Sequence, residues 1–301
     1  MRKDLISLAD LTTEEILDLL DFADRLKQIQ HAGQPYRPLA GKVLVMLFEK
    51  PSLRTRVTFE TGMYQLGGTS IFMETRLGER ETVPDVARNL TRWVDGIVAR
   101  TFSHEAVVQL AELTTIPVIN ALTDKLHPCQ ILADAQALRE HKGDFANLKV
   151  AFVGDGNNVC ASWLNFSARV PLNFALACPE GYEPDPEIVA FAKREAKGEI
   201  LITNDCEAAL KDADAVYTDV WASMGQEEES TAREAVFAPY QVNAKLMSLA
   251  KKDAIFMHCL PAHRNSEVTD EVMDSPQSIV FDQAENRLHA QKAVMARLMS
   301  K

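Results

Sequence analysis

Long hydrophobic runs are missing from this 301-residue sequence, although 47% of its residues are hydrophobic. A membrane-spanning helix needs about 20 consecutive apolar residues. The sequence has no run of even eighteen, so we expect no membrane partner. The first fifteen residues also lack the apolar core of a signal peptide, which favours a cytoplasmic location.

Cysteine is scarce, and its spacing argues against two structural roles. The sequence has five cysteines, and they form no CxxC pair: Cys129, Cys160, Cys178, Cys206 and Cys259. Neither a disulfide framework nor a zinc site is expected from an odd, widely spaced set. Both absences favour a reducing compartment.

Positive charge is in deficit, with 32 basic against 43 acidic residues and a net charge of −11. Nucleic acids and anionic membranes attract basic surfaces, so we expect neither as a partner. Arg54 and Arg56 form a local gathering of positive charge. An acidic protein can still bind a small anion at such a place.

Short apolar runs alternate with helical patterns along most of the chain. The first helix begins after Thr12, with Glu15 completing a capping box. Predicted strands are residues 43–48, 70–73, 96–99, 117–120, 150–153, 173–177, 215–218, 254–257 and 278–281. This alternation predicts an α/β fold with mostly parallel sheets flanked by helices.

The length fits two domains of ordinary size. We place a first domain at residues 1–142 and a second at 148–285, because the polar segment between them follows a helix and precedes a fresh strand. The last helix, within residues 286–301, is expected to pack back on the first domain.

Six polar clusters follow predicted strands, at the edge where open parallel sheets bind ligands. They are SLRTR at 52–56, Arg100, HPCQ at 127–130, GDGNN at 154–158, Asp219 with SMG at 223–225, and HCLP at 258–261. One such cluster is unremarkable, whereas six of the same kind indicate binding sites.

The segment 52–56 suits a phosphate group. Ser52 is a plausible helix N-cap, and the N–H groups at a helix start favour a dianion. Arg54 and Arg56 add guanidinium groups that pair with oxygens two at a time. The alternative is a capped helix with solvated arginines. His127 and Cys259, taken alone, also have structural alternatives, a helix cap and a buried thiol.

The glycines at 154 and 156 resemble the start of a dinucleotide fingerprint, but Val159 stands where the third glycine is required. We interpret this segment as a tight strand-to-helix turn that presents Asn158. A nicotinamide-dependent dehydrogenase remains an alternative.

Together these motifs resemble the transcarbamoylase family, from the first helix to the last. The motifs at 52–56 and 127–130 are shared across that family and imply carbamoyl phosphate. Those at 154–158, 219–225 and 258–261 are similar to the branch that uses ornithine. The resemblance implies transfer of the carbamoyl group to the side-chain amine of ornithine, giving citrulline and phosphate. No metal or redox cofactor is implied, because carbamoyl phosphate is already activated.

The resemblance also implies site residues. Carbamoyl phosphate would be bound by Ser52, Leu53, Arg54, Thr55, Arg56, Arg100, His127, Gln130, Cys259, Leu260 and Arg287. Ornithine would be bound by Asn158, Asp219, Ser223 and Met224. The catalytic candidates are Arg100, His127, Asp219 and Cys259. The family further implies a homotrimer or a multiple of it.

Two further alternatives stay open. Another amine, such as putrescine or acetylornithine, would be the acceptor in related enzymes, although the segment 223–225 argues against both. A binding or scaffold protein on the same fold would not need the complete set of polar groups.

Overall fold

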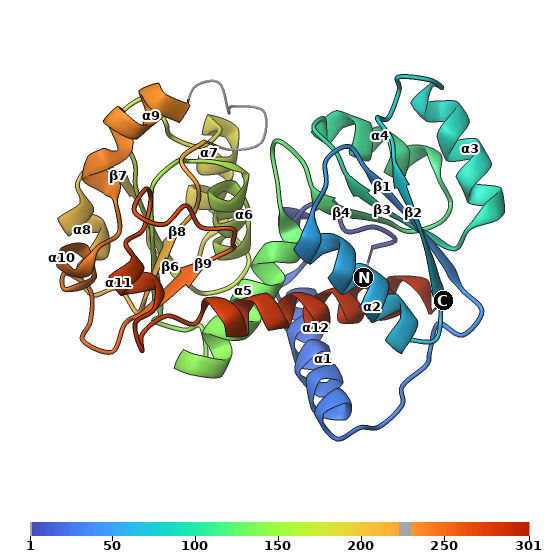
Figure 1. Ribbon diagram of the computed structural model, residues 1–301, viewed down its shortest axis with the longest axis horizontal. Coiled ribbons are helices and arrows are strands. Elements are labelled where there is room, and N and C mark those ends of the chain that lie inside the picture. The colour runs from blue at the N-terminus through green and yellow to red at the C-terminus, as the bar shows by residue number, and fades with distance from the viewer. Residues whose placement is uncertain (1, 223–229, 301) are drawn as a thin grey trace. The chain divides into compact units, whose positions relative to one another are not determined.

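The computed structural model describes residues 2–222 and 230–300. The chain forms two compact units (Figure 1). Unit 1 consists of Met1–Gln136 and Glu285–Lys301, and unit 2 of Ala137–Ala284. The predicted α/β class with two parallel sheets is confirmed, as is the return of the last helix to the first part of the chain. No helix in the described ranges is long and apolar enough to span a membrane.

Unit 1 contains a four-stranded parallel sheet in the order β2-β1-β3-β4. Its strands are β1 (Val43–Phe48), β2 (Thr69–Glu74), β3 (Gly96–Arg100) and β4 (Val118–Leu122). Its helices are η1 (Leu8–Asp10), α1 (Thr13–His31), α2 (Leu53–Gln65), α3 (Val83–Trp93) and α4 (His104–Leu113). Two longer helices, α5 (Pro128–Lys142) and α12 (Val280–Met299), continue from one unit into the other.

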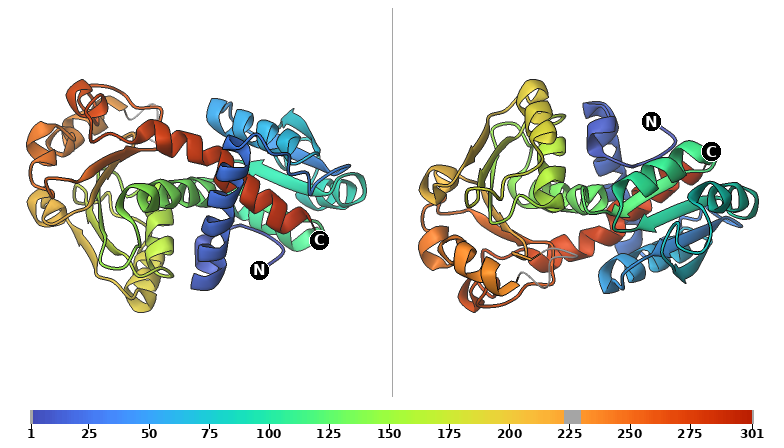
Figure 2. Two further views of the ribbon diagram at one scale, coloured as in Figure 1. Left: turned by 90° about the horizontal axis from the view of Figure 1, so that it is seen from below. Right: turned by 90° about the horizontal axis from the view of Figure 1, so that it is seen from above.

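The two faces of this sheet are covered by different helices. Apolar side chains of α3 and α4 form a core with one face of the strands: Ala87, Leu90, Val107 and Leu110 with Val45, Leu47, Ile97 and Ala99. On the other face, the Met299 side chain of α12 lies against Gly96. Helix α1 packs on α12, where Arg297 pairs with Asp18 at 2.7 Å (Figure 2).

Unit 2 contains a five-stranded parallel sheet in the order β7-β6-β5-β8-β9. Its strands are β5 (Lys149–Val153), β6 (Asn173–Ala177), β7 (Ile200–Thr203), β8 (Ala215–Thr218) and β9 (Ile255–His258). Its helices are α6 (Asn158–Ser167), α7 (Pro186–Glu195), α8 (Cys206–Leu210), α9 (Ser230–Phe237), η3 (Ala238–Tyr240), α10 (Ala244–Met247) and α11 (Asp270–Met273).

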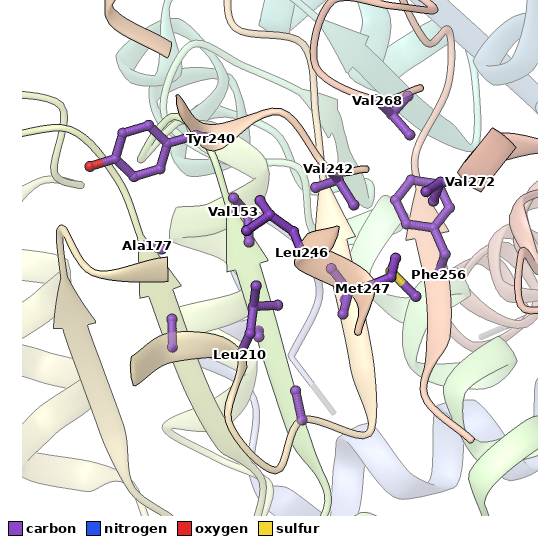
Figure 3. Packing of buried hydrophobic residues seen from close by; sticks show 14 of the residues in the cluster. Val153, Ala177, Leu210, Tyr240, Val242, Leu246, Met247, Phe256, Val268 and Val272 are labelled. Atoms are coloured by element: carbon purple, nitrogen blue, oxygen red, sulfur yellow. The ribbon is translucent and has the colours of Figure 1, made fainter. Parts of the chain in front are cut away.

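Both faces of the second sheet are also buried. On one face, α8, α10 and α11 pack against the strands through an apolar cluster that includes Leu210, Leu246, Met247, Val272 and Phe256 (Figure 3). On the other face, Trp163 of α6 lies against aromatic side chains of the strands, Phe174 and Tyr217. Burial on both faces explains why these strands are continuous apolar runs rather than alternating ones.

Two elements differ from the sequence prediction. Residues 278–281 were predicted as a strand, but Ser278 forms only an isolated bridge with Phe256 and α12 begins at Val280. Helix α12 therefore starts six residues before the predicted Asn286. Strand β7 was missed, because it is a half-buried edge strand of four residues.

Candidate active site

The polar residues of unit 1 lie where the strand order of its sheet changes from one side of β1 to the other. From β1 the chain passes to β2 on one side, and then crosses to β3 on the other side. Ligands of open α/β sheets bind at such a switch point, beyond the carboxyl ends of the strands. Residues 52–56 follow β1 and Arg100 ends β3, so both lie at the switch point. His127 follows β4, the next strand.

Helix α2 starts directly at this point with its N-terminus unoccupied by a capping side chain. Ser52 holds the N-cap position in an extended conformation, but its hydroxyl makes no capping hydrogen bond. The first N–H groups of any helix have no partner within that helix. The start of α2 therefore offers backbone donors and a hydroxyl to an anion.

Three buried side chains from separate helices form one hydrogen-bonded group in unit 1. Arg287 of α12 donates to Gln130 Oε1 at 2.5 Å and to Thr55 Oγ1 at 3.1 Å. Gln130 in turn donates to Asp134 at 2.7 Å. Because the Thr55 hydroxyl accepts from Arg287, its own hydrogen remains able to point at a ligand.

His127 is held uncharged in the same part of unit 1. Its side chain is buried, and burial lowers its pKa well below the ordinary value for histidine. The positive charges of Arg287 and Arg100 lower it further. An imidazole that stays neutral near pH 7 donates one N–H and keeps one lone pair. His127 is therefore suited to donate a hydrogen bond without adding charge.

Two further residues of the SLRTR segment, Leu53 and Arg56, differ in their surroundings. The side chain of Leu53 is 75% exposed, so only its backbone suits the proposed anion site. Arg56 donates its Nε to Glu60 at 3.0 Å, and its guanidinium lies 3.8 Å from the Phe72 ring centroid. Arg56 is exposed whereas Arg54 is half-buried, which favours Arg54 as the main phosphate partner.

The polar residues of unit 2 also lie at a switch point. From β5 the chain runs through β6 to β7 on one side, and then returns to β8 on the other side. Residues 154–158 follow β5 and Asp219 follows β8. Cys259 follows β9, the neighbour of β8.

Asp219 is the centre of the group in unit 2. It is buried, and it accepts hydrogen bonds from the Cys259 thiol at 3.0 Å and from Asn157 Nδ2 at 2.8 Å. Asn157 also caps α6 by accepting from two backbone N–H groups. Asn158, the predicted ligand, is the first residue of that helix and is half-buried. Leu260 donates its N–H to His258 Nδ1 at 2.9 Å.

A second carboxylate lies close to this group and was not predicted. Asp155 is paired with Arg233 at 3.0 Å, and Arg233 also donates to the backbone oxygen of Trp221 at 2.8 Å. Burial raises the pKa of Asp155 to about 6, and the charge of Asp219 raises it too, whereas Arg233 lowers it. The two residues of this pair are 78 positions apart, so spacing along the sequence gave no signal for it.

Residues 182–184 pack against the glycine turn after β5, and this packing argues against a dinucleotide site there. A Cβ added at Gly156 would lie 2.4 Å from the backbone nitrogen of Pro184 and 2.6 Å from the carbonyl carbon of Glu183. The Gly156 N–H donates to the Tyr182 backbone oxygen at 2.9 Å. The space that a pyrophosphate requires beside this glycine is thus filled by residues 182–184.

The predicted residues accordingly form two groups. Unit 1 brings together Thr55, Gln130 and Arg287, with Arg100 and His127 nearby. Unit 2 brings together Asp219 and Cys259, because the Cys259 thiol donates a hydrogen bond to Asp219. Ser223 and Met224 lie outside the described residues.

Known proteins resemble this chain along its whole length. Residues 3–140 match the carbamoyl-P binding domain, and residues 146–298 the Asp/Orn binding domain, of the aspartate/ornithine carbamoyltransferases. The chain therefore belongs to the aspartate/ornithine carbamoyltransferase family.

Individual relatives narrow the comparison. The chain is 52% identical over 302 residues to the ornithine carbamoyltransferase of Syntrophus aciditrophicus, covering 99% of this chain and 100% of the relative. It is 50% identical to the solved ornithine carbamoyltransferase from Pyrococcus furiosus, with a TM-score of 0.95 over 98% of this chain and 96% of that one. The enzyme from Thermus thermophilus is 45% identical, with a TM-score of 0.90 over 99% of both chains.

Proposed function

We propose that this chain transfers the carbamoyl group of carbamoyl phosphate to the side-chain amine of L-ornithine, giving L-citrulline and phosphate. The observation that carries the proposal is the contrast between two polar groups at two switch points. The group in unit 1 is rich in arginine, and the group in unit 2 is built on carboxylates. Relatives whose sequences are about 50% identical to this chain are named ornithine carbamoyltransferase.

In this proposal, unit 1 binds carbamoyl phosphate. The phosphate group is held by the start of α2 and by the side chains of Ser52, Arg54 and Thr55, with Arg56 at the rim. Two arginines and the backbone donors of a helix start suit a dianion, because guanidinium groups pair with phosphate oxygens two at a time. The backbone groups of Cys259 and Leu260 complete the set that we assign to carbamoyl phosphate, whereas we assign the Cys259 thiol to ornithine.

The carbamoyl oxygen becomes negative when an amine attacks the carbon. We assign Arg100, His127 and Gln130 as the donors to this oxygen, with Arg287 and the Thr55 hydroxyl beside them. Donors aimed at a developing charge each contribute about 10²–10³-fold in rate. The lowered pKa of His127 supports this role, because the neutral ring donates an N–H throughout the pH range in which ornithine loses its proton.

Unit 2 binds ornithine in this proposal. Asp219 pairs with the α-ammonium group, and Asn158 with Ser223 and Met224 binds the amino-acid end. A second substrate of negative charge, such as aspartate, would meet the carboxylates of Asp219 and Asp155. The carboxylates therefore favour a cationic amino acid.

The chemistry needs two proton transfers and no cofactor. The amine of ornithine loses a proton and attacks the carbamoyl carbon, and the bond from that carbon to the phosphate oxygen then breaks. Cys259, hydrogen-bonded to Asp219, orients the amine and helps to remove its proton. The departing phosphate accepts the proton that remains on the nitrogen. Holding two reactants in line supplies roughly 7–11 kcal/mol of the rate enhancement.

The test is an assay of the purified full chain with carbamoyl phosphate and a panel of amines. We expect citrulline and phosphate in equal amounts from ornithine, and far slower reaction with putrescine, acetylornithine or aspartate. Release of phosphate without citrulline, or preference for another amine, would contradict the proposal.

We assign residues 1–142 with 286–301 to carbamoyl phosphate binding, and 148–285 to ornithine binding. We expect a homotrimer or a multiple of it, which light scattering coupled to size-exclusion chromatography measures. We also place the enzyme in the cytoplasm and in arginine metabolism, a location that five free cysteines favour.

A further inference from the structure

Three side chains with metal-binding atoms meet in unit 1, apart from the groups described above. His31 is the last residue of α1, and Glu285 and His289 are one turn apart on α12. The Nε2 atoms of His31 and His289 lie 3.1 Å and 3.4 Å from the same carboxylate oxygen, Glu285 Oε1. All three atoms lie within 4.8 Å of one another.

These separations match the spacing of ligands around a small metal ion. Zinc binds histidine nitrogen and carboxylate oxygen at about 2.0–2.2 Å, which places neighbouring ligands of a tetrahedron roughly 3.3–3.5 Å apart. Both imidazoles already point their Nε2 atoms at one oxygen, so a metal ion at the centre of the group requires little movement. Two imidazoles and one carboxylate are a set that suits zinc.

We propose that His31, Glu285 and His289 form a binding site for a divalent zinc ion, with water as the fourth ligand. The side chain of His289 is fully buried, which fixes its ring before the metal arrives. The side chains of His31 and Glu285 are 59% and 43% exposed, which leaves the ion a route from solvent. Burial lowers the pKa of His289 to about 4, so no proton competes for this ring near pH 7.

Two lysines oppose a cation here, because the charges of Lys292 and Lys27 both lower the pKa of His289. The Lys27 ammonium lies 4.0 Å from Glu285 Oε2 and donates to Asn286 Oδ1 at 2.8 Å. It thus faces the carboxylate oxygen that the histidines do not use. Glu285 would bind zinc through Oε1 alone, and Lys27 reduces the affinity without blocking the site.

The site has a consequence for the helix turn that carries Arg287. This residue lies between Glu285 and His289 in the sequence, and its guanidinium holds Gln130 and Thr55. A metal ion bound to both ends of the turn and to the end of α1 would hold the turn still. Zinc should therefore raise the stability of the protein and, if the proposed function is correct, alter its affinity for carbamoyl phosphate.

A second group with metal-binding atoms, Asp219, His258 and Cys259, is a poorer candidate. Both ring nitrogens of His258 are already engaged, because Nδ1 accepts from the Leu260 N–H and Nε2 pairs with buried Glu267 at 3.1 Å. This group is the alternative zinc site that the experiment has to distinguish from the proposed one.

The experiment measures Zn²⁺ binding to chelator-stripped full-length protein by titration calorimetry. We expect one ion per chain, and a dissociation constant more than about tenfold higher in His31→Ala and in Glu285→Gln, because each removes a ligand. His141→Ala is the matched control, because this residue is likewise a histidine paired with a carboxylate, that of Asp282 at 2.9 Å. It should bind zinc like the unchanged protein. Zn²⁺ should also raise the melting temperature of the control but not that of His31→Ala.

Co²⁺ in place of Zn²⁺ separates the two groups. The proposed site gives visible d–d bands without a sulfur-to-cobalt charge-transfer band, whereas binding at Cys259 gives that band. Unchanged zinc affinity in both ligand variants, or a charge-transfer band that Cys259→Ser removes, would overturn the proposal. Neither readout depends on turnover, so failure of the metal site is distinct from failure of the proposed function.

Discussion

Asp219 accepts hydrogen bonds from a thiol and from an amide, and the two donors come from different loops of unit 2. An ionised carboxylate has about four lone-pair positions, so it can bind an ammonium group in addition to these donors. The thiol of Cys259 is thereby directed by the residue that we assign to the α-ammonium. A change of the Cys259 side chain should consequently alter the kinetics with ornithine rather than the binding of carbamoyl phosphate.

Replacement of Cys259 by serine tests this role. We expect kcat/KM for ornithine to fall by about 10²-fold or more, because a positioned proton-transfer group typically contributes about 10²–10⁴-fold, and we expect the pH profile to change. Equilibrium binding of carbamoyl phosphate should remain close to that of the unchanged protein.

Cys206→Ser is the control, because Cys206 is a half-buried cysteine of α8 in the same unit. It should leave ornithine kinetics unchanged. A Cys259→Ser protein that differs only in melting temperature would identify the thiol as structural.

The pair of Asp155 and Arg233 provides a prediction about pH. Arg233 lowers the pKa of Asp155, which burial raises to about 6. In Arg233→Gln the pKa of Asp155 should rise further, so Asp155 would be protonated at higher pH and the negative charge near Asp219 would be lost there. We expect a higher KM for ornithine and an acid limb of kcat/KM that moves to higher pH.

Arg264→Gln is the matched control for that variant. Arg264 is an exposed arginine of unit 2 that pairs with Asp270 and Asp274. It should leave the pH profile in place. If the acid limb of kcat/KM does not move in Arg233→Gln, Asp155 has no role in ornithine binding.

Among the elements, the turn from β5 to α6 requires a glycine at one position. Gly156 fits only because it has no side chain where the backbone of residues 183–184 passes. Gly156→Ala should destabilise unit 2 by about 1–3 kcal/mol, which is typical of overpacking, and should raise the KM for ornithine because Asn157 and Asn158 follow directly. Denaturant unfolding and steady-state kinetics measure the two effects.

Gly143→Ala is the control for Gly156→Ala, because it introduces backbone strain without crowding any neighbouring atom. Gly143 has a φ of 82° with no atom within 4 Å of the added Cβ, so its replacement costs only the left-handed backbone, about 1–2 kcal/mol. It should leave ornithine kinetics unchanged. Equal kinetic effects from both variants would argue against a specific role for the turn.

The sequence predicted eight of the nine strands in the described residues and missed one edge strand, β7. Strand β1 was predicted with its observed bounds, because it is a buried apolar run followed by a proline and a helix cap. The half-buried edge strand β7 has too little apolar pattern in four residues to be recognised. Three of the residues 278–281 are apolar, and periodicity alone does not distinguish a strand from the first turn of a helix in so short a run.

The polar groups were predictable only in part. The residues after each strand were identified because parallel strands end at a common edge. The contact between Arg233 and Asp155 and the contact between Arg287 and Thr55 join positions far apart in the chain. Such contacts depend on tertiary packing, which spacing along a sequence does not encode.

For the whole molecule, buried histidines predict sensitivity to mild acid. Burial lowers the pKa of His127 well below its usual range and that of His289 to about 4. The unfolded chain binds protons at these rings below pH 6.5, whereas the folded chain does not. Stability should therefore fall as pH drops from 7.5 to 6.0, by about 1 kcal/mol or less for each histidine.

Urea unfolding at pH 7.5 and 6.0 measures this loss. The raised pKa of Asp155 acts in the opposite direction, but its window lies between the ordinary carboxyl value and about 6, below the range compared. A midpoint that rises from pH 7.5 to 6.0 would contradict the prediction.

The division of the chain between the units has a consequence for its synthesis. Unit 2 is one continuous segment, whereas unit 1 needs Glu285–Lys301, which leave the ribosome only after all of unit 2. Met299, which lies against Gly96 of β3, is among them. Domains made on ribosomes commonly fold in the order in which they emerge. Here we expect unit 2 to finish folding first, because unit 1, although it begins earlier in the chain, completes its core only when α12 has been made.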